Sequence, residues 1–233
     1  MSAFSLTIRA LKNPTYWAFF VPSIILTAIF MFSVEMTKFI FEKIADFESV
    51  KWAANALGKG LIILGAFSLK FFLLTLLSPL LAYMSERIDE DFASFPRKFT
   101  MSQFIWAILR SVAVAIAALT FQSIAIVVMA IPAWFLSDII FLIVMFAISS
   151  FFLGFAFFDY SLERHRYAFA ESFTWFGENA LQCFWIGALF NAVTYLPLHF
   201  EIMPIYYIGM AMMPAAMTVY ATFIFLKRKE LII

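Results

Sequence analysis

SVAVAIAALTFQSIAIVVMAIPAWFLSDIIFLIVMFAISSFFLGFAFF, residues 111–158, contains a single ionisable side chain, Asp138. A helix of about 17–25 apolar residues can cross the hydrocarbon core of a bilayer. The two halves of this stretch, 111–137 and 139–158, each satisfy that length and meet at Asp138, close to Pro132. Because a proline and a charged residue together mark a turn, we predict a helical hairpin in a membrane.

A second hairpin is predicted near the C-terminus. The apolar runs 180–198 and 202–226 are separated by His199-Phe200-Glu201, with a proline on either side. A hairpin that crosses the membrane twice and a re-entrant hairpin that dips halfway both return the chain to its starting side. The sequence therefore leaves both arrangements open for the two hairpins. A buried tip requires that protein or water satisfy its backbone groups.

Two single apolar runs precede the hairpins, 16–34 and 61–84, and the second is uncharged except for Lys70. The chain is 64% hydrophobic and 13% charged, whereas soluble domains are about 45–50% apolar and about 25% charged. The period-two alternation of a β-barrel is absent. We expect an all-α integral membrane protein, with two transmembrane helices plus two helical hairpins in a single multi-pass domain over residues 1–233.

Three polar connectors join these runs, at 35–60, 85–110 and 159–179. In the first, apolar residues such as Ile40 and Ile44 recur at helical spacing among charges, which predicts an amphipathic helix at an interface or against the bundle. Eleven lysines and arginines fall on the side of the two termini, against four in the first connector. Since cytoplasmic loops are enriched in these residues, both termini are predicted to be cytoplasmic.

Several functional classes are disfavoured by the sequence. A net charge of +1 argues against a nucleic-acid partner. Cys183 is the single cysteine, so neither an intramolecular disulfide nor a multi-cysteine metal site is expected. His165 and His199 lie on opposite sides in the fully spanning arrangement, and no glycine-rich phosphate loop is present. We expect no catalytic activity, no metal and no cofactor.

Lys70 is the first candidate for a substrate pathway, because an ionisable group inside a span is costly and often functional. It would attract an anion if it faces a hydrated pathway; alternatively it snorkels, or pairs with a carboxylate such as Asp138. Glu86 and Arg87 follow the second run. They line an entrance, or they form a solvated helix end in which Arg87 pairs with Glu90, three residues on.

Asp138, His199 and Glu201 complete the candidate pathway, and their roles depend on depth. In the loops of fully spanning hairpins they are ordinary polar turn residues. At the tip of a re-entrant hairpin they become pathway candidates, because helix ends there also contribute dipoles.

A basic cluster, Arg164-His165-Arg166, lies close to the predicted membrane face. It could collect anions or neutralise lipid phosphates. The structural alternative is that Asp159 caps the next segment while Tyr160 and Tyr167 anchor the chain at the interface.

The segment Phe158-Asp159-Tyr160-Ser161-Leu162-Glu163-Arg164-His165-Arg166-Tyr167-Ala168-Phe169 resembles the CysZ-type sulfate permease family, which also includes the etoposide-induced membrane proteins. That family has an Asp-Tyr pair leaving a membrane helix, then a histidine followed by a basic residue, then a phenylalanine. The residues that match at this spacing are Asp159, Tyr160, His165, Arg166 and Phe169. Weaker similarity covers Leu80-Leu81-Ala82 with Glu86, and Pro197, Met203-Pro204 and Gly209.

The resemblance implies an ATP-independent permease or channel-like pathway for a small anion, sulfate in the family, formed by several subunits in the cell membrane, here a bacterial inner membrane. Two departures concern the anion site. Where the permeases have Gly-Leu-Leu-Ala-Glu, this chain has Pro79-Leu80-Leu81-Ala82-Tyr83, and their arginine pair is replaced by Thr15-Tyr16-Trp17-Ala18. The alternative is therefore a non-transporting scaffold or accessory subunit that binds a membrane protein partner. The lipid bilayer is a partner in either case.

Overall fold

The computed structural model describes residues 2–45, 51–93, 101–133, 138–200 and 202–231. These described residues form helices and contain no strand. The helices are α1 (Ala3–Leu11), α2 (Pro14–Ala45), α3 (Lys51–Ala93), α4 (Met101–Ala133), α5 (Asp138–Arg164), α6 (Phe169–Glu178), α7 (Ala180–His199) and α8 (Met203–Arg228). The predicted all-α fold class is confirmed.

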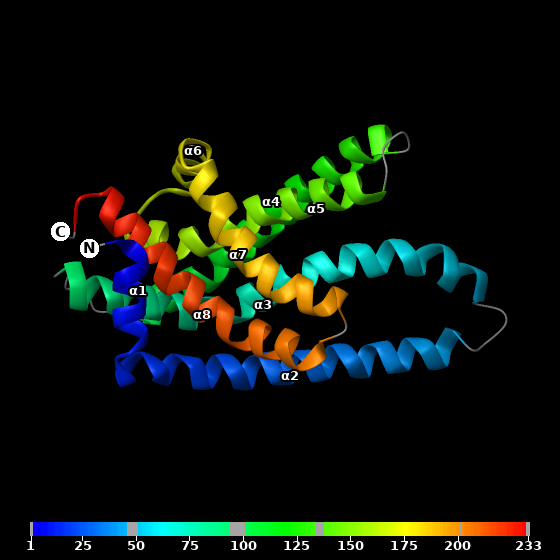
Figure 1. Ribbon diagram of the computed structural model, residues 1–233, viewed down its shortest axis with the longest axis horizontal. Coiled ribbons are helices and arrows are strands. Elements are labelled where there is room, and N and C mark those ends of the chain that lie inside the picture. Colours follow the sequence, from blue (N-terminus) through cyan, green and yellow to red (C-terminus); the bar gives the residue numbers. More distant parts are fainter. Residues whose placement is uncertain (1, 46–50, 94–100, 134–137, 201, 232–233) are drawn as a thin grey trace.

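The long helices run back and forth in the order that the apolar runs predict (Figure 1). Helix α2 leads away from the end of the molecule where both termini lie, and α3 returns to it. Helices α4 and α5 form one hairpin, and α7 and α8 form the other. The short helices α1 and α6 lie near the end with the termini, where α1 packs against α8.

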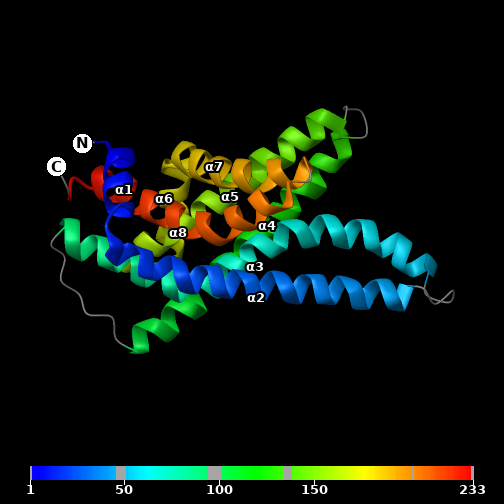
Figure 2. The same cartoon turned by 60° about the horizontal axis from the view of Figure 1, so that its bottom comes forward.

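Four segments of the described residues are long and apolar enough to cross a membrane: Pro14–Phe32, Lys70–Ala93, Ile108–Ala125 and Met203–Arg228. Helix α7 has 20 residues, which is about 30 Å at the rise of an α-helix and matches the hydrocarbon thickness of a bilayer. In both views, the α2–α3 pair reaches farther from the termini than the turn between α7 and α8 (Figures 1 and 2). Full crossing by the two hairpins stays a prediction.

The charged connectors differ from the prediction in one respect. The described parts of 35–60 do not form a separate amphipathic helix, because α2 continues to Ala45 and α3 already begins at Lys51. The helical spacing of the apolar residues in this connector is therefore divided between the end of α2 and the start of α3. The short connecting helix is α6, within 159–179.

Helices α5 and α7 pack backbone to backbone through two glycines. A Cβ atom added at Gly154 would overlap the carbonyl group of Cys183, and one added at Gly187 would overlap the carbonyl group of Ser150. Small residues spaced four apart allow such close approach between membrane helices. One turn further along α7, this contact places Asn191 against α5, where it forms part of the site described next.

Candidate functional site: an arginine-lined cavity and a buried lysine

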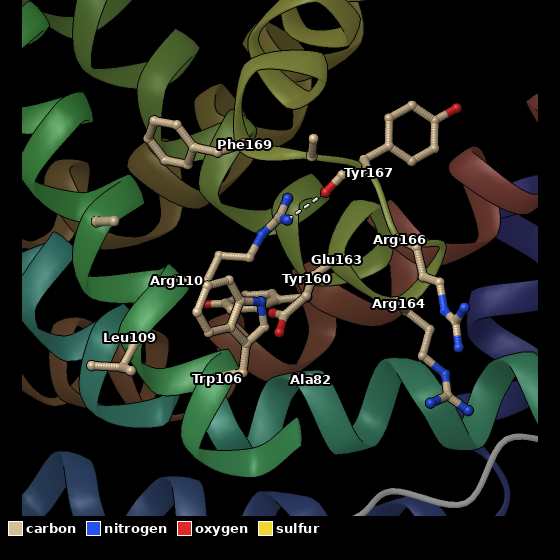
Figure 3. A pocket seen from close by; sticks show the side chains of 12 residues that line it. Ala82, Trp106, Leu109, Arg110, Tyr160, Glu163, Arg164, Arg166, Tyr167 and Phe169 are labelled. Atoms are coloured by element: carbon tan, nitrogen blue, oxygen red, sulfur yellow. Dashed lines mark hydrogen bonds between the residues drawn. The ribbon is translucent and has the colours of Figure 1, made fainter. Parts of the chain in front are cut away.

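A cavity of about 580 Å³ lies between α3, the first turns of α4, the end of α5 and the segment leading into α6 (Figure 3). Its ionisable lining residues are Arg110, Glu163, Arg164 and Arg166. The rest of the wall is apolar or aromatic, and includes Trp106, Leu109, Tyr160 and Phe169. The cavity is thus amphiphilic.

Arg110 joins three helices at the back of this cavity. Its Nη2 atom lies 2.8 Å from Asp159 Oδ1 and donates to Ser172 Oγ at 2.6 Å, while Nε donates to Asp159 Oδ2 at 3.3 Å. Nη1 donates to the carbonyl of Tyr167 (Figure 3). Both partners of the ion pair are buried, and removing one partner of such a pair costs about 3–5 kcal/mol. The guanidinium therefore fixes α4, α5 and α6 relative to one another.

The expectation that Asp159 caps the next segment is wrong, because its carboxylate faces Arg110. The first turn of α6 is capped instead by Glu171, whose carboxylate accepts from the Ala168 amide at 2.6 Å. The interface anchor proposed for Tyr160 is also wrong: this side chain is buried, 4% exposed, and donates to the Leu74 carbonyl at 3.1 Å.

The end of α5 is tied to α3 by two further buried pairs. Arg164 Nη2 lies 2.8 Å from Glu86 Oε1. His165 Nε2 lies 3.2 Å from Asp89 Oδ2, and this contact is an ion pair when the imidazole is protonated. The His165 ring also packs against Phe225 at 4.8 Å between centroids. These contacts give Arg164 and His165 a clear structural role.

Glu86 and Arg87 do not act as a pair. Glu86 faces Arg164 in the interior, whereas Arg87 lies outside and contacts Glu90 at 3.2 Å and Asp91 at 3.5 Å. The second alternative from the sequence, a helix end with Arg87 and Glu90 in contact, is what the structure contains.

Arg166 differs from Arg110 and Arg164, the other two arginines of the cavity, in its backbone conformation and in its ion pairing. Its backbone has φ 61°, in the left-handed region that costs a residue with a Cβ atom about 1–2 kcal/mol. Its amide donates to the Glu163 carbonyl at 2.9 Å, and the Tyr167 amide donates to the Leu162 carbonyl at 3.0 Å, the pattern that closes helices with glycine at this position. Within the described part of the chain, no carboxylate lies within ion-pair distance of its guanidinium.

Glu163 is the one carboxylate among the described residues that line the cavity. It lies in the last turn of α5, beyond the apolar run 139–158. Burial raises its pKa to about 7, the negative charge of Asp159 acts in the same direction, and Arg110 opposes both. At neutral pH this side chain therefore exchanges between its neutral and charged forms.

Lys70 lies inside the bundle, with 7% of the residue exposed. Its ammonium donates to Asn191 Oδ1 at 2.6 Å and lies 5.9 Å from the centre of the Phe190 ring. The Asn191 amide in turn donates to Ser150 Oγ at 3.0 Å and Ser149 Oγ at 3.3 Å. Lys70, Asn191, Ser149 and Ser150 therefore form a buried polar cluster, the Lys70 cluster, that joins α3, α5 and α7.

A second, small cavity of about 10 Å³ is lined by residues of α3, α4 and α5, and a volume of this size holds about one water molecule. Tyr160 lines both cavities. Phe71, next to Lys70 on α3, lines the small one. At its wall Ser111 Oγ donates to Ser78 Oγ at 2.7 Å. Polar groups therefore occur along α3 between the large cavity and Lys70.

The remaining sequence candidates lie elsewhere. Asp138 is the first residue of α5 and His199 is the last residue of α7, but their side chains, and Glu201 as a whole, lie outside the described residues. Of the loop residues that carry the family resemblance, Tyr160, Arg166 and Phe169 line the large cavity. A search of the described residues finds no cluster of histidine, cysteine, aspartate or glutamate suited to a metal ion.

These features define a multi-pass α-helical membrane protein with charged groups held in its interior. The chain belongs to the sulfate transporter CysZ/etoposide-induced protein 2.4 family, whose family model matches residues 3–204. A comparison with curated proteins gave no match.

Proposed function

We propose that the protein is an ATP-independent permease, or channel-like pathway, for a small anion, and that sulfate is the first anion to test. The observation that carries this proposal is the Lys70 ammonium inside the bundle. Placing a lysine at the centre of a membrane helix costs about 2.5–3.5 kcal/mol on insertion scales, so such residues commonly mark ion pathways. Family membership supports the same function.

The surroundings of Lys70 suit a dehydrated oxyanion. An anion that leaves water needs hydrogen-bond donors to replace its hydration shell. The ammonium, the Asn191 amide and the hydroxyls of Ser149 and Ser150 supply such donors within one cluster. In the structure Lys70 donates to Asn191 and Asn191 donates to the two serines, while the Ser150 hydroxyl donates to the Phe146 carbonyl. Exchange of these internal bonds for bonds to the anion would make passage reversible.

We further propose that several copies of the chain assemble in the membrane. Long apolar faces remain exposed, for example at Trp17, Val21 and Ile25 on α2, and lipid or further copies of the chain would cover them. A pathway formed by several subunits would bring several copies of Lys70 together. We place the protein in a bacterial inner membrane with both termini in the cytoplasm, as the distribution of basic residues predicts.

The test is sulfate uptake by liposomes that contain the purified protein. Wild type is compared with Lys70→Gln, which removes the charge, and Lys70→Arg, which keeps it. Lys227→Gln is the matched control, because Lys227 is exposed at the end of α8. We expect saturable uptake by wild type, at least about tenfold slower uptake by Lys70→Gln, and partial activity of Lys70→Arg. Monodispersity and melting temperature show whether each variant is folded.

A non-transporting scaffold or accessory subunit is the second candidate. It is favoured by the pairing of Arg110 with Asp159 and of Arg164 with Glu86, since these arginines hold helices together. If wild type moves neither sulfate, phosphate nor chloride faster than empty liposomes, and co-purifies stably with a membrane protein, the scaffold replaces the permease.

A further inference from the structure

We propose that the arginine-lined cavity binds the phosphodiester headgroup of an anionic phospholipid, with Arg166 as its principal phosphate contact. This inference concerns a different site from the Lys70 cluster and does not depend on transport. It follows from the charge of the cavity, from the backbone conformation of Arg166, and from the apolar wall.

The charge of the cavity fits a monoanion when Glu163, the carboxylate that also lines it, is in its neutral form. Two of its three arginines are neutralised by the buried partners Asp159 and Glu86. Arg166 is the lining cation for which the described residues supply no carboxylate. A phosphodiester carries one negative charge, whereas a sulfate dianion would call for a second cation without a carboxylate. An arginine presents paired N–H donors that match phosphate oxygens.

The backbone of Arg166 points to a ligand as well. The residue closes α5 at a left-handed position where glycine is the usual choice. Left-handed backbone at non-glycine residues clusters at ligand clamps and other functional sites, although Glu230 adopts it as well. Among the described residues, no ion pair uses the Arg166 guanidinium, which leaves it available to a ligand. Figure 3 shows Arg164 and Arg166 extending in the same direction from the end of α5.

The apolar side chains of the cavity wall can pack against acyl chains, whereas they offer no hydrogen bonds to a small hydrated ion. Trp106 is 63% exposed, Leu109 56% and Phe169 42%. The exposed stripe continues along α4 at spacings of three and four residues, through Ile105, Leu109, Val112 and Ile116. A headgroup at Arg166 would thus lie at one side of the cavity, and its acyl chains would extend across the cavity to the hydrophobic track on α4 (Figure 3). Tryptophan and tyrosine are typical of the level at which headgroups lie.

The test uses the full chain purified in a zwitterionic environment. Binding of phosphatidylglycerol and of phosphatidylcholine is measured by native mass spectrometry and by the shift in melting temperature. Inorganic phosphate and sulfate are added in parallel, to separate a lipid headgroup from a free anion. We expect phosphatidylglycerol to bind and raise the melting temperature and phosphatidylcholine to leave it nearly unchanged. Any shift by phosphate or sulfate should be the same in Arg166→Gly as in wild type, because these ions would bind in the Lys70 cluster.

Arg166→Gly is the decisive variant, because glycine accepts the left-handed position while the charge is lost. We expect its affinity for phosphatidylglycerol to fall at least about tenfold, as for a lost charge-assisted bond, with a melting temperature equal to or above that of wild type. Glu230→Gly is the control for backbone relief, since Glu230 has φ 56° at the end of α8. Arg9→Gln is the control for charge, because Arg9 is exposed on α1 at the same end of the molecule.

Three results would overturn the proposal. Arg166→Gly could bind phosphatidylglycerol as tightly as wild type, or phosphatidylcholine could bind equally well. A shift of the melting temperature by free phosphate or sulfate that is as large as the lipid's and is lost in Arg166→Gly would assign the cavity to a small anion instead.

Discussion

At the scale of single residues, Arg110 and Asp159 form the contact whose loss the protein should tolerate least. Both are buried, so Arg110→Met would leave a carboxylate in the interior without its partner. We expect this variant to lose about 3–5 kcal/mol of unfolding free energy, and Asp159→Asn in the same background to recover part of it. Equilibrium unfolding in mixed micelles measures both.

Arg87→Met is the matched control for that experiment. The Arg87 side chain is 42% exposed, and exposed ion pairs contribute about 0–1 kcal/mol. Equal losses for the two arginine variants would show that the buried pair has no special role.

Glu163 should make stability depend on pH. Its pKa is raised to about 7 in the folded protein by burial and by the charge of Asp159, so between about pH 4.5 and 7 the folded state binds more protons than the unfolded state. Stability therefore falls as pH rises through this window. We expect the melting temperature to fall from pH 5 to 8 in wild type and to fall less in Glu163→Gln.

The control for this pH series is Glu178→Gln, because Glu178 is exposed at the end of α6. Its melting temperatures should follow those of wild type. A Glu163→Gln variant with the same pH dependence as wild type would show that another group is responsible.

At the scale of helices, the contact between α5 and α7 positions the polar cluster around Lys70. The backbones meet so closely that even a methyl group at Gly154 or Gly187 overlaps a carbonyl group, which no rotamer change can relieve. We expect Gly187→Ala to destabilise the protein by about 3 kcal/mol or more. Thermal unfolding with size-exclusion chromatography checks this.

Gly177→Ala is the control, since a Cβ atom there meets nothing within 4 Å. Its stability should stay within about 1 kcal/mol of wild type. If Gly187→Ala behaves in the same way, the two helices are not as close as the structure places them.

Helix extents illustrate what local sequence does and does not predict. The apolar runs predict the long helices and their order, because span length and hydropathy are local properties. The amphipathic spacing of segment 35–60 predicts one connecting helix. Such spacing does not distinguish a separate connecting helix from the ends of the two transmembrane helices on either side of it. In the structure α2 extends to Ala45 and α3 begins at Lys51, so the segment belongs to two long helices.

The candidate site was only partly predictable. Lys70 is recognisable in the sequence because it is a charged residue within an apolar run. Its partner Asn191 on α7 is 121 positions away, and a single sequence does not show which distant residues are in contact. Arg110 was missed, although a signal existed: Arg110 lies 23 residues before the end of α4 at Ala133, and Asp159 lies 21 residues after the start of α5 at Asp138, so the two are at similar distances from the turn of the first hairpin. The strain at Arg166 is a backbone property that the sequence does not display.

At the scale of the whole molecule, both termini lie at the same end (Figure 1), and the basic residues predict that this end is cytoplasmic. We expect a green fluorescent protein fused to the C-terminus to be fluorescent in bacterial cells and an alkaline phosphatase fused there to be inactive. The opposite pair of results would reverse the orientation and place the arginine-lined cavity on the outer face.

The central claim is that the ammonium inside the bundle provides a passage for a small anion. The measurement that tests it most directly is the initial rate of sulfate uptake by liposomes containing equal amounts of folded wild type, Lys70→Gln or Lys227→Gln. We predict saturable uptake for wild type and Lys227→Gln, and a rate at least about tenfold lower for Lys70→Gln. Uptake by Lys70→Gln at the wild-type rate, or none by wild type, would contradict the claim.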